Sequence, residues 1–352
     1  MPLVNTKQMF EEALKGGFAV GAFNVNNMEI IQGIMWAAKD RDAPLILQIS
    51  RGAREYANMT WLKGLIDVAV AEAPEIPIAI HLDHGTAEVA MQCIDEGYNS
   101  VMYDGSHDPL EENIAVTKKI CDAAHAHDPY ITVEAELGQL GGIEEDVVGV
   151  SEEDIEKFLT DPEDAERFVK ESGVDSLAVA IGTSHGAYKF SKEPKLAFDR
   201  IEEIGRRLPG FPLVMHGSSS VPQEFINKIN SFAVLESGNE EMLKMALEEG
   251  WEQMPNSMGV PEDAIAKAVK MAVCKVNIDT DLRLALTSSI LEVWANCNRK
   301  LFDWIKGGRQ GKRPEFLFDP RKYLGPGREA IKEMVGHKMD ILGASGKASL
   351  LR

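Results

Sequence analysis

Three histidines that follow apolar runs of strand length are the first indication of chemistry in this sequence. They are His84, His185 and His216. Three imidazoles that leave one coordination position open are a typical ligand set of catalytic zinc. A single histidine at a strand end is more often a hydrogen-bonded structural residue. Three of them at one end of the same fold would predict a metal centre.

Carboxylates accompany these histidines. Asp83 directly precedes His84, and alternation along a strand points the two side chains in different directions while both stay near the metal. That position suits a general base, and it equally suits a carboxylate that orients a metal-binding histidine. Asp104, Glu134 and Glu136 leave the same two interpretations open.

The segment 136–146 combines three glycines with three consecutive acidic residues. Its composition predicts a mobile loop that could carry Glu144 or Glu145 over a bound substrate and transfer a proton there. A solvated acidic surface loop would have the same composition. Both interpretations remain open at this point.

Segments rich in glycine and hydroxyl side chains follow the strands that precede His185 and His216. They are residues 185–189 and 216–220, and the polar segment 277–280 overlaps the end of a further apolar run. Backbone amides of small residues can approach a phosphate closely, and barrel enzymes often hold phosphate near their last two strands. Most such runs are plain turns, so their coincidence with the histidines is what favours a phosphate site.

The elements that must position these residues form a repeat of apolar runs, most of them followed by a helical pattern. The predicted strands are 19–23, 45–49, 78–82, 100–103, 131–135, 176–181, 212–215 and 274–278. The predicted helices between them are 29–40, 62–73, 89–96, 112–125, 162–172, 196–207 and 261–273. Polar residues gather after the strands, at the ends that meet in one barrel mouth. We therefore predict an α/β fold, a (β/α)8 TIM barrel that forms a single domain over residues 1–352.

Two stretches depart from the repeat. Residues 231–256 carry several glutamates and predict an acidic helical insertion before the last strand. From about residue 288 the chain continues as a C-terminal helical extension, with a basic segment at 299–322 and a terminal helix near 328–342. We interpret the basic segment as a solvated or subunit-contacting surface.

Composition excludes several classes of protein. A net charge of −19 and a pI near 4.9 argue against a nucleic-acid partner, because phosphate backbones are held by clustered Lys and Arg. No apolar stretch approaches the ~20 residues of a membrane span. The four cysteines are widely spaced without a secretory leader, which predicts reduced thiols in a cytoplasmic protein.

The sequence resembles the class II, metal-dependent fructose-1,6-bisphosphate aldolases, a family that also includes tagatose-bisphosphate aldolases. The resemblance covers nearly the whole chain and is carried by residues 21–27, 81–85, 134–138, 182–186, 216–219 and 277–281. It implies one catalytic Zn²⁺ per subunit, a sugar bisphosphate substrate, a monovalent cation (Na⁺ or K⁺) near the phosphate site, and a homodimer or homotetramer. The insertion at 231–256 departs from shorter members and bears on subunit packing.

The resemblance also implies roles for individual residues. His84, His185 and His216 would bind zinc, Asp83 would act on the C4 hydroxyl, and Glu144 or Glu145 would handle the proton at the enediolate carbon. Asp104, Glu134 and Glu136 lie near the metal in the family and can hold it in alternative positions. Phosphate and hydroxyl contacts would fall to Asn24, Ser50, Gly186, Lys189, Gly217, Ser218, Asn277, Asp279 and Thr280. Arg283 resembles the distal phosphate anchor, which a neighbouring subunit often offers.

Three alternatives stand beside this hypothesis. We expect fructose 1,6-bisphosphate as the substrate in preference to tagatose 1,6-bisphosphate, which differs at one stereocentre; the sequence alone does not show which hydroxyl orientation the site accepts. A catalytically silent barrel could bind zinc and sugar phosphate as a sensor, although it would be expected to lose an acid/base residue. A Schiff-base aldolase would need a lysine inside the barrel, and Lys275 is the only lysine within a predicted strand; a buried ionic partner is the other interpretation of it.

Overall fold

The computed structural model describes residues 3–144, 147–148, 158–185, 196–237, 258–315 and 317–352, with residues 141–144, 147–148, 185 and 231–237 described by their backbone only. Parallel strands close into a barrel in the order β1-β11-β10-β8-β5-β4-β3-β2. These strands are β1 (Val20–Asn24), β2 (Leu45–Ser50), β3 (Ile78–Gly85), β4 (Ser100–Tyr103), β5 (Thr132–Leu137), β8 (Ser176–Val179), β10 (Leu213–Met215) and β11 (Val273–Ile278).

All eight predicted strands are present, with ends shifted by at most three residues. The closing pair joins β1 to β11, with Ala22 opposite Asn277. Every strand residue of β1, β2 and β11 is buried, because the faces of a parallel barrel are covered by helices outside and by other strands inside. The predicted (β/α)8 barrel is therefore confirmed.

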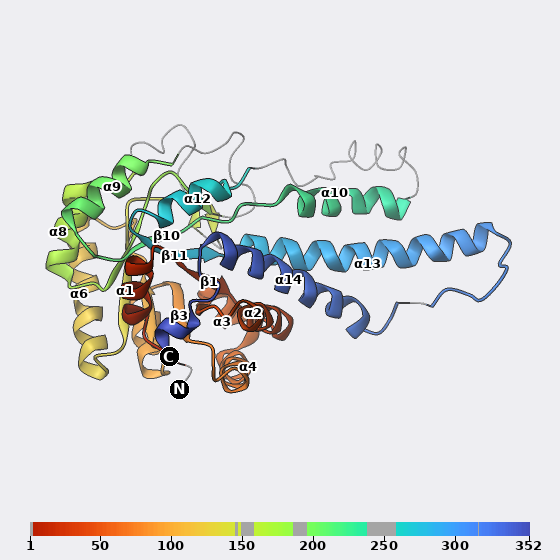
Figure 1. The fold of residues 1–352 in the computed structure, drawn as a ribbon, viewed down its shortest axis with the longest axis horizontal. Coiled ribbons are helices and arrows are strands. Elements are labelled where there is room, and N and C mark those ends of the chain that lie inside the picture. The colour runs from red at the N-terminus through yellow and green to blue at the C-terminus, as the bar shows by residue number, and fades with distance from the viewer. Residues whose placement is uncertain (1–2, 145–146, 149–157, 186–195, 238–257, 316) are drawn as a thin grey trace.

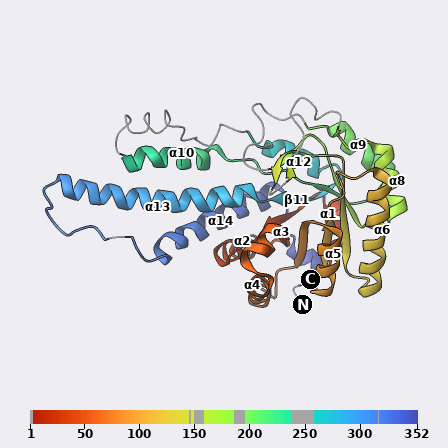
Figure 2. The same cartoon turned by 180° about the vertical axis from the view of Figure 1, so that it is seen from behind.

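Helices surround the barrel (Figure 1). They are α2 (Met28–Arg41), α3 (Arg51–Ala57), α4 (Met59–Glu72), α5 (Ala87–Asp95), α6 (Leu110–His127), α8 (Pro162–Ser172), α9 (Phe198–Arg207) and α12 (Glu262–Val269). The helix that follows β10, α10 (Gln223–Ser237), projects away from the barrel (Figures 1 and 2). Side-chain caps explain several starts: Asn27 accepts from the amide of Ile30, and Asp161 accepts from the amides at the start of α8. The helix predicted at 261–273 was too long, because residues 273–278 form β11.

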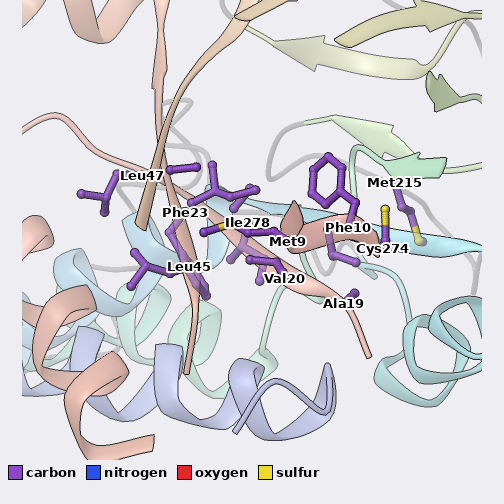
Figure 3. Packing of buried hydrophobic residues seen from close by; sticks show 14 of the residues in the cluster. Met9, Phe10, Ala19, Val20, Phe23, Leu45, Leu47, Met215, Cys274 and Ile278 are labelled. Carbon is purple, nitrogen blue, oxygen red and sulfur yellow. The ribbon is translucent and has the colours of Figure 1, made fainter. Parts of the chain in front are cut away.

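The first helix, α1 (Thr6–Gly16), closes the end of the barrel where the strands begin. The chain just before it bonds to the start of β3, since the amide of Val4 donates to the carbonyl of Ile78. Met9 and Phe10 are at most 2% exposed and pack among strand side chains such as Val20 and Met215 (Figure 3). Burying such side chains stabilises the fold by roughly 1.5–3 kcal/mol each. The opposite mouth is left for the polar strand ends.

The C-terminal helices extend away from the barrel in both views (Figures 1 and 2). The long helix α13 (Thr280–Lys306) runs outward beside α10, and α14 (Arg321–Ile341) returns along it to pack on α2. The 3-10 helix η1 (Ala348–Leu351) ends the chain. None of the helices described is long and apolar enough to cross a bilayer.

Several predicted boundaries in these regions were wrong. The extension was placed from about 288, but its first helix already starts at Thr280, and the terminal helix begins at Arg321 instead of 328. Pro326 and its flanking glycines argue locally against helix, yet the segment is helical and packs closely on α13, where a Cβ on Gly327 would lie 2.6 Å from the side chain of Leu286. Of the predicted acidic insertion, residues 231–237 belong to α10, and residues 238–257 lie outside the described residues.

The segment predicted as a mobile loop at 136–146 contains regular structure. Residues 136 and 137 finish β5, and β6 (Gly141–Glu144) pairs with β7 (Val147–Val148) and with β9 (Ser184–His185). A small separate sheet therefore lies beside the barrel mouth. Its glycines fit the close pairing of Gly142 with His185.

Candidate active site

Two of the three predicted metal ligands face each other at the barrel mouth. Nε2 of His84, near the end of β3, lies 2.9 Å from Nδ1 of His216, the residue after β10. The two rings meet nearly edge to face, at an interplanar angle of 86°. Asp83 adds a carboxylate oxygen 3.9 Å from Nε2 of His84, and one ligand atom from each of these three residues lies within 4.8 Å of the others. The donor set suits a divalent metal.

The remaining ring nitrogens of both histidines are held by carboxylates. Nδ1 of His84 lies 3.0 Å from Oδ2 of Asp104, which directly follows β4. Nε2 of His216 lies 2.8 Å from Oε1 of Glu134 on β5. A carboxylate that accepts from one ring nitrogen fixes the tautomer, so that the other nitrogen presents its lone pair. The other two nitrogens, Nε2 of His84 and Nδ1 of His216, lie 2.9 Å apart, and Nδ2 of Asn277 lies 3.0 Å from the second of them, so both imidazoles are oriented toward one position where a metal could bind.

The electrostatics favour neutral imidazole at His216 and charged carboxylates around it. Burial lowers the pKa of His216 even though Glu134 raises it. Burial would raise the pKa of Glu134, but Lys275 lowers it overall, and the hydrogen bond from His84 does the same to Asp104. Metal ligation needs the neutral form of histidine. His216 therefore favours the protonation state that a metal requires of it.

Glu136 lies further from the histidines than the other two carboxylates. Its Oε2 is 3.8 Å from Nδ1 of His84, and it forms a second possible ligand group with His84 and Asp104. The residue is 2% exposed. It is therefore placed as an alternative metal ligand or as a partner of His84, and the two interpretations made from sequence both fit its position.

Asp83 is held by two amides that converge from opposite sides. Nδ2 of Asn24, at the end of β1, donates to its Oδ2 over 2.8 Å, and Nδ2 of Asn277 on β11 donates to its Oδ1 over 3.1 Å. Gln48 of β2 donates in turn to Oδ1 of Asn24. Asp83 is 1% exposed. This chain of amides fixes a carboxylate next to the metal-facing nitrogens, as a general base requires.

Lys275 lies beneath the histidines, and its ammonium group is fully hydrogen-bonded to other side chains. Its ammonium donates to both oxygens of Glu134 at 3.0 and 2.8 Å and to Nε2 of His81 at 3.0 Å. These contacts use its three N–H bonds, and the side chain is fully buried. The other ring nitrogen of His81, Nδ1, lies 2.8 Å from Oγ of Ser100 and forms a hydrogen bond with it. The lysine is therefore the buried ionic partner foreseen from sequence, and its position argues against a Schiff-base nucleophile.

Backbone conformation contributes to the geometry at two points. His84 has a φ of 49°, a left-handed conformation that is uncommon for a side chain other than glycine. Gly217 has a φ of 60°, and a Cβ there would lie 2.7 Å from the carbonyl oxygen of Ser184. Only glycine allows this contact. The chain after His216 is thereby pressed against the strand that carries His185.

Arg283 lies beside a cavity at the same mouth. The cavity has a volume of about 260 Å³ and is lined by Asn24, Val25, Asn26, Ser50, Gly52, Ala53, Tyr56 and Arg283. Nη2 of Arg283 contacts Oδ2 of Asp279 at 2.5 Å, and the arginine side chain is 55% exposed. The arginine lines this cavity together with Asn24 and Ser50 of its own chain.

The other predicted residues divide into three groups. Ser218 is buried behind His216, where its hydroxyl donates to the carbonyl of Met215, and Asp279 and Thr280 start α13. His185 and Glu144 are described by backbone only, in the neighbouring strands β9 and β6. Glu145, Gly186 and Lys189 lie outside the described residues.

Sequence reasoning missed the supporting residues Gln48 and Ser100, and it assigned His81 only a core role. Each is at most 3% exposed, and each is a polar residue within or next to an apolar strand run. Such a residue must find a buried partner, which was the available signal. The identity of that partner depends on which strands become neighbours.

Comparisons with known proteins agree with this geometry. The family model described as "Fructose-bisphosphate aldolase class-II" matches residues 4–347. A fructose-bisphosphate aldolase of Giardia intestinalis is 47% identical, with 99% of this chain and 95% of that protein covered. One from Treponema pallidum is 44% identical, with 98% of both covered. The crystal structure of the YdjI aldolase from Escherichia coli K12 aligns with a TM-score of 0.68 and 25% identity, over 98% of this chain and 99% of that one.

Proposed function

This chain belongs to the class II fructose-bisphosphate aldolases, and on that basis we propose that it reversibly cleaves fructose 1,6-bisphosphate into dihydroxyacetone phosphate and glyceraldehyde 3-phosphate with zinc. The family is metal-dependent. The observation that supports zinc chemistry most is the facing pair His84 and His216, each with its second nitrogen held by a carboxylate. His185 would complete the ligand set, with Asp104, Glu134 and Glu136 as supporting or alternative ligands.

Cleavage between C3 and C4 of a ketose leaves electrons beside the carbonyl. A bound zinc ion would supply the Lewis acid that draws this charge onto oxygen. Burial favours the neutral form of His216, and neutral imidazole ligands would preserve the net positive charge of such a centre. No lysine needs to form an imine, because Lys275 is fully engaged by Glu134 and His81.

Asp83 takes the proton of the C4 hydroxyl in this proposal. Asn24 and Asn277 hold its two oxygens, so the carboxylate meets the hydroxyl in one orientation. A positioned general base contributes typically ~10²–10⁴ in rate. Glu144 or Glu145 moves the proton at the enediolate carbon, and the pairing of β6 with β9 places Gly142, two residues before Glu144, opposite His185.

The two phosphates bind on either side of this centre. Segments 185–189 and 216–220 offer backbone amides and hydroxyls to one of them. Asn277, Asp279 and Thr280 offer contacts to phosphate or to the sugar hydroxyls. The cavity at Ser50 and Arg283 takes the other, because it offers a guanidinium and a hydroxyl near Asp83. Two anchors at opposite ends fix the sugar so that C4 meets the base. A Na⁺ or K⁺ ion near the first phosphate belongs to the same proposal.

We extend the proposal to the assembly and location of the enzyme. One barrel domain over residues 1–352 would form a homodimer or homotetramer, and it would act in the cytoplasm without nucleic-acid or membrane partners. Phe302 and Ile305 lie near the outer end of the projecting helix α13 and are about half exposed; an interface between subunits would use such side chains. All four cysteines are unpaired, which fits a reducing compartment.

The test is a coupled assay of triose phosphate release. The purified enzyme is assayed as isolated, after treatment with a chelator, and after zinc is added back. We expect activity to disappear with the chelator and to return with zinc. The variant His84→Ala should stay inactive after zinc addition, whereas the matched control His127→Ala, on the half-exposed end of α6, should behave as the unmodified enzyme.

Activity that survives complete metal removal, or a lysine–substrate adduct trapped by borohydride, would refute the zinc mechanism. Equal or faster cleavage of tagatose 1,6-bisphosphate would refute the preference for the fructose sugar. A protein that binds zinc without releasing triose phosphate from either sugar would refute the enzymatic function itself.

A further inference from the structure

Lys338 is a buried lysine of the C-terminal helix α14 that lies outside the catalytic centre. Its side chain is 4% exposed, and its ammonium contacts Oγ of Ser220 at 2.5 Å, Oε1 of Glu262 at 2.7 Å and Oδ2 of Asp281 at 3.0 Å. Burial lowers its pKa, but Asp281 and Glu262 raise that pKa overall. The lysine is thus charged and fully engaged. Burying an ammonium group carries a large desolvation penalty, which its contacts with the two carboxylates must offset.

Asp281, one of these carboxylates, also binds the backbone of the chain after His216. The residue is fully buried in the first turn of α13. Its Oδ1 accepts from the amide of Val221 at 2.9 Å, and its Oδ2 accepts from the amide of Ser220 at 3.0 Å. One carboxylate therefore connects the chain after β11 to the chain after β10.

The chain that Asp281 holds has an unfavourable conformation. Val221 has a φ of 50°, and a β-branched residue rarely adopts this left-handed region. Two hydrogen bonds to a charged oxygen pair can stabilise such a conformation, since each is worth about twice a neutral one. Without them we expect segment 216–221 to relax toward ordinary backbone angles.

The same segment is also fixed at its other end. Gly217 is pressed against the backbone of Ser184, and the carbonyl of Ser219 accepts from the amide of Val260 at 3.2 Å. Residues 218 and 219 are at most 4% exposed. Segment 216–221 therefore has one fixed conformation that depends on contacts from β9, from Val260 two residues before α12, and from α13.

We propose that Lys338 and Asp281 are positioning residues for substrate phosphate. Asp281 sets the conformation of segment 216–221, whose amides and hydroxyls receive the phosphate. Lys338 neutralises the buried negative charge of Asp281, so that this carboxylate can stay ionised and hold the segment. The helix α14 thereby takes part in substrate binding although it begins some forty residues after α13 starts. This inference rests on the proposed function, because it assigns that segment to phosphate.

The test compares Lys338→Met and Asp281→Asn with the control Lys332→Met. Lys332 lies on the same helix and pairs with Asp40 at the surface, at 2.6 Å. The holoenzymes are assayed for kcat and KM with fructose 1,6-bisphosphate, and inorganic phosphate is titrated in as a ligand by calorimetry. Because hydrogen bonds to charged groups are at stake, we expect KM and the Kd for phosphate to rise about tenfold or more in both variants. We expect kcat to change less, and the control to match the unmodified enzyme.

Unfolding in urea accompanies these measurements, so that a loss of folded protein is not taken for a loss of affinity. Folded Lys338→Met with an unchanged Kd for phosphate would overturn the inference. If Lys338→Met does not fold, Asp281→Asn decides by the same criterion, since it keeps one acceptor and removes the charge. An unmodified enzyme that is active, with both variants unaffected, overturns only this inference; an unmodified enzyme without aldol cleavage overturns the proposed function instead.

Discussion

Replacing Lys275 with methionine should destabilise the protein strongly, because it removes the counter-charge of a buried carboxylate. The ammonium lies 2.8 Å from Oε2 of Glu134, and the two side chains are 0% and 1% exposed. Methionine has a similar length and no charge, so the change leaves the packing volume nearly the same. The effect should therefore come from electrostatics and not from a cavity.

The magnitude follows from the burial of the pair. Removing one partner of a fully buried ion pair costs about 3–5 kcal/mol, whereas replacing both partners with uncharged groups is often close to neutral. We expect Lys275→Met to lower the free energy of unfolding by that amount. Adding Glu134→Gln should recover at least about 1 kcal/mol, because residues in direct contact show such coupling.

The assay is urea unfolding of the two single variants and the double variant, all in excess chelator so that metal binding does not contribute to stability. A matched control is Lys228→Met, since Lys228 makes a surface ion pair with Glu292 at 3.1 Å, and such pairs contribute about 0–1 kcal/mol. A loss below about 1 kcal/mol for Lys275→Met, or strictly additive effects in the cycle, would contradict the view that these two charges hold each other in the core.

Three further predictions concern the reaction and pH. Asp83→Asn should lower kcat by about 10²–10⁴ while metal analysis still finds zinc; loss of zinc in this variant would instead make Asp83 a ligand. His216→Ala should lose zinc on dialysis against chelator faster than the unmodified enzyme, and equal retention would remove His216 from the ligand set. Burial raises the pKa of Cys121 to about 12, whereas an unfolded thiol ionises near pH 8.5. Between that pH and about pH 12 the folded state therefore binds one more proton than the unfolded state, so the free energy of unfolding should fall as pH rises. Cys121→Ala should reduce the slope of unfolding free energy against pH by up to about 1.4 kcal/mol per pH unit. An unchanged slope in this variant would count against the buried thiol.

The strands could be predicted from sequence because each one is an apolar, β-branched run between helical patterns. Runs such as 45–50 are buried on every residue, so burial and propensity agree. Helix ends were less predictable where packing opposes propensity. The segment around Pro326 is helical because α13 and α2 provide neighbours that a local pattern does not contain.

The sequence allowed several site residues to be predicted, but not the hydrogen-bond partners of those residues. Position after a strand was enough to select Asp83, His84 and His216. The partners of these residues come from elsewhere in the chain: Glu134 bonds to a histidine 82 residues away, and Asn277 to an aspartate 194 residues away. Such pairs depend on barrel closure, which no local pattern encodes.

Lys338 illustrates the same limit in a stronger form. On the sequence it is one lysine of a mixed helix, and its ammonium bonds to residues 76 and 118 positions earlier. Local periodicity places it on a helix without saying which neighbour it meets. Only the return of α14 toward the barrel makes it a buried charge.

The pairing of β1 with β11 has a consequence for synthesis on the ribosome. A nascent chain that has not yet released residues 273–278 has all the other strands available but exposes two unpaired sheet edges, at β1 and β10. Open edges of this kind are prone to pair with other chains. Prompt emergence of the final quarter of the polypeptide, or shielding by a chaperone until then, should therefore govern how much of the newly made protein reaches its folded form.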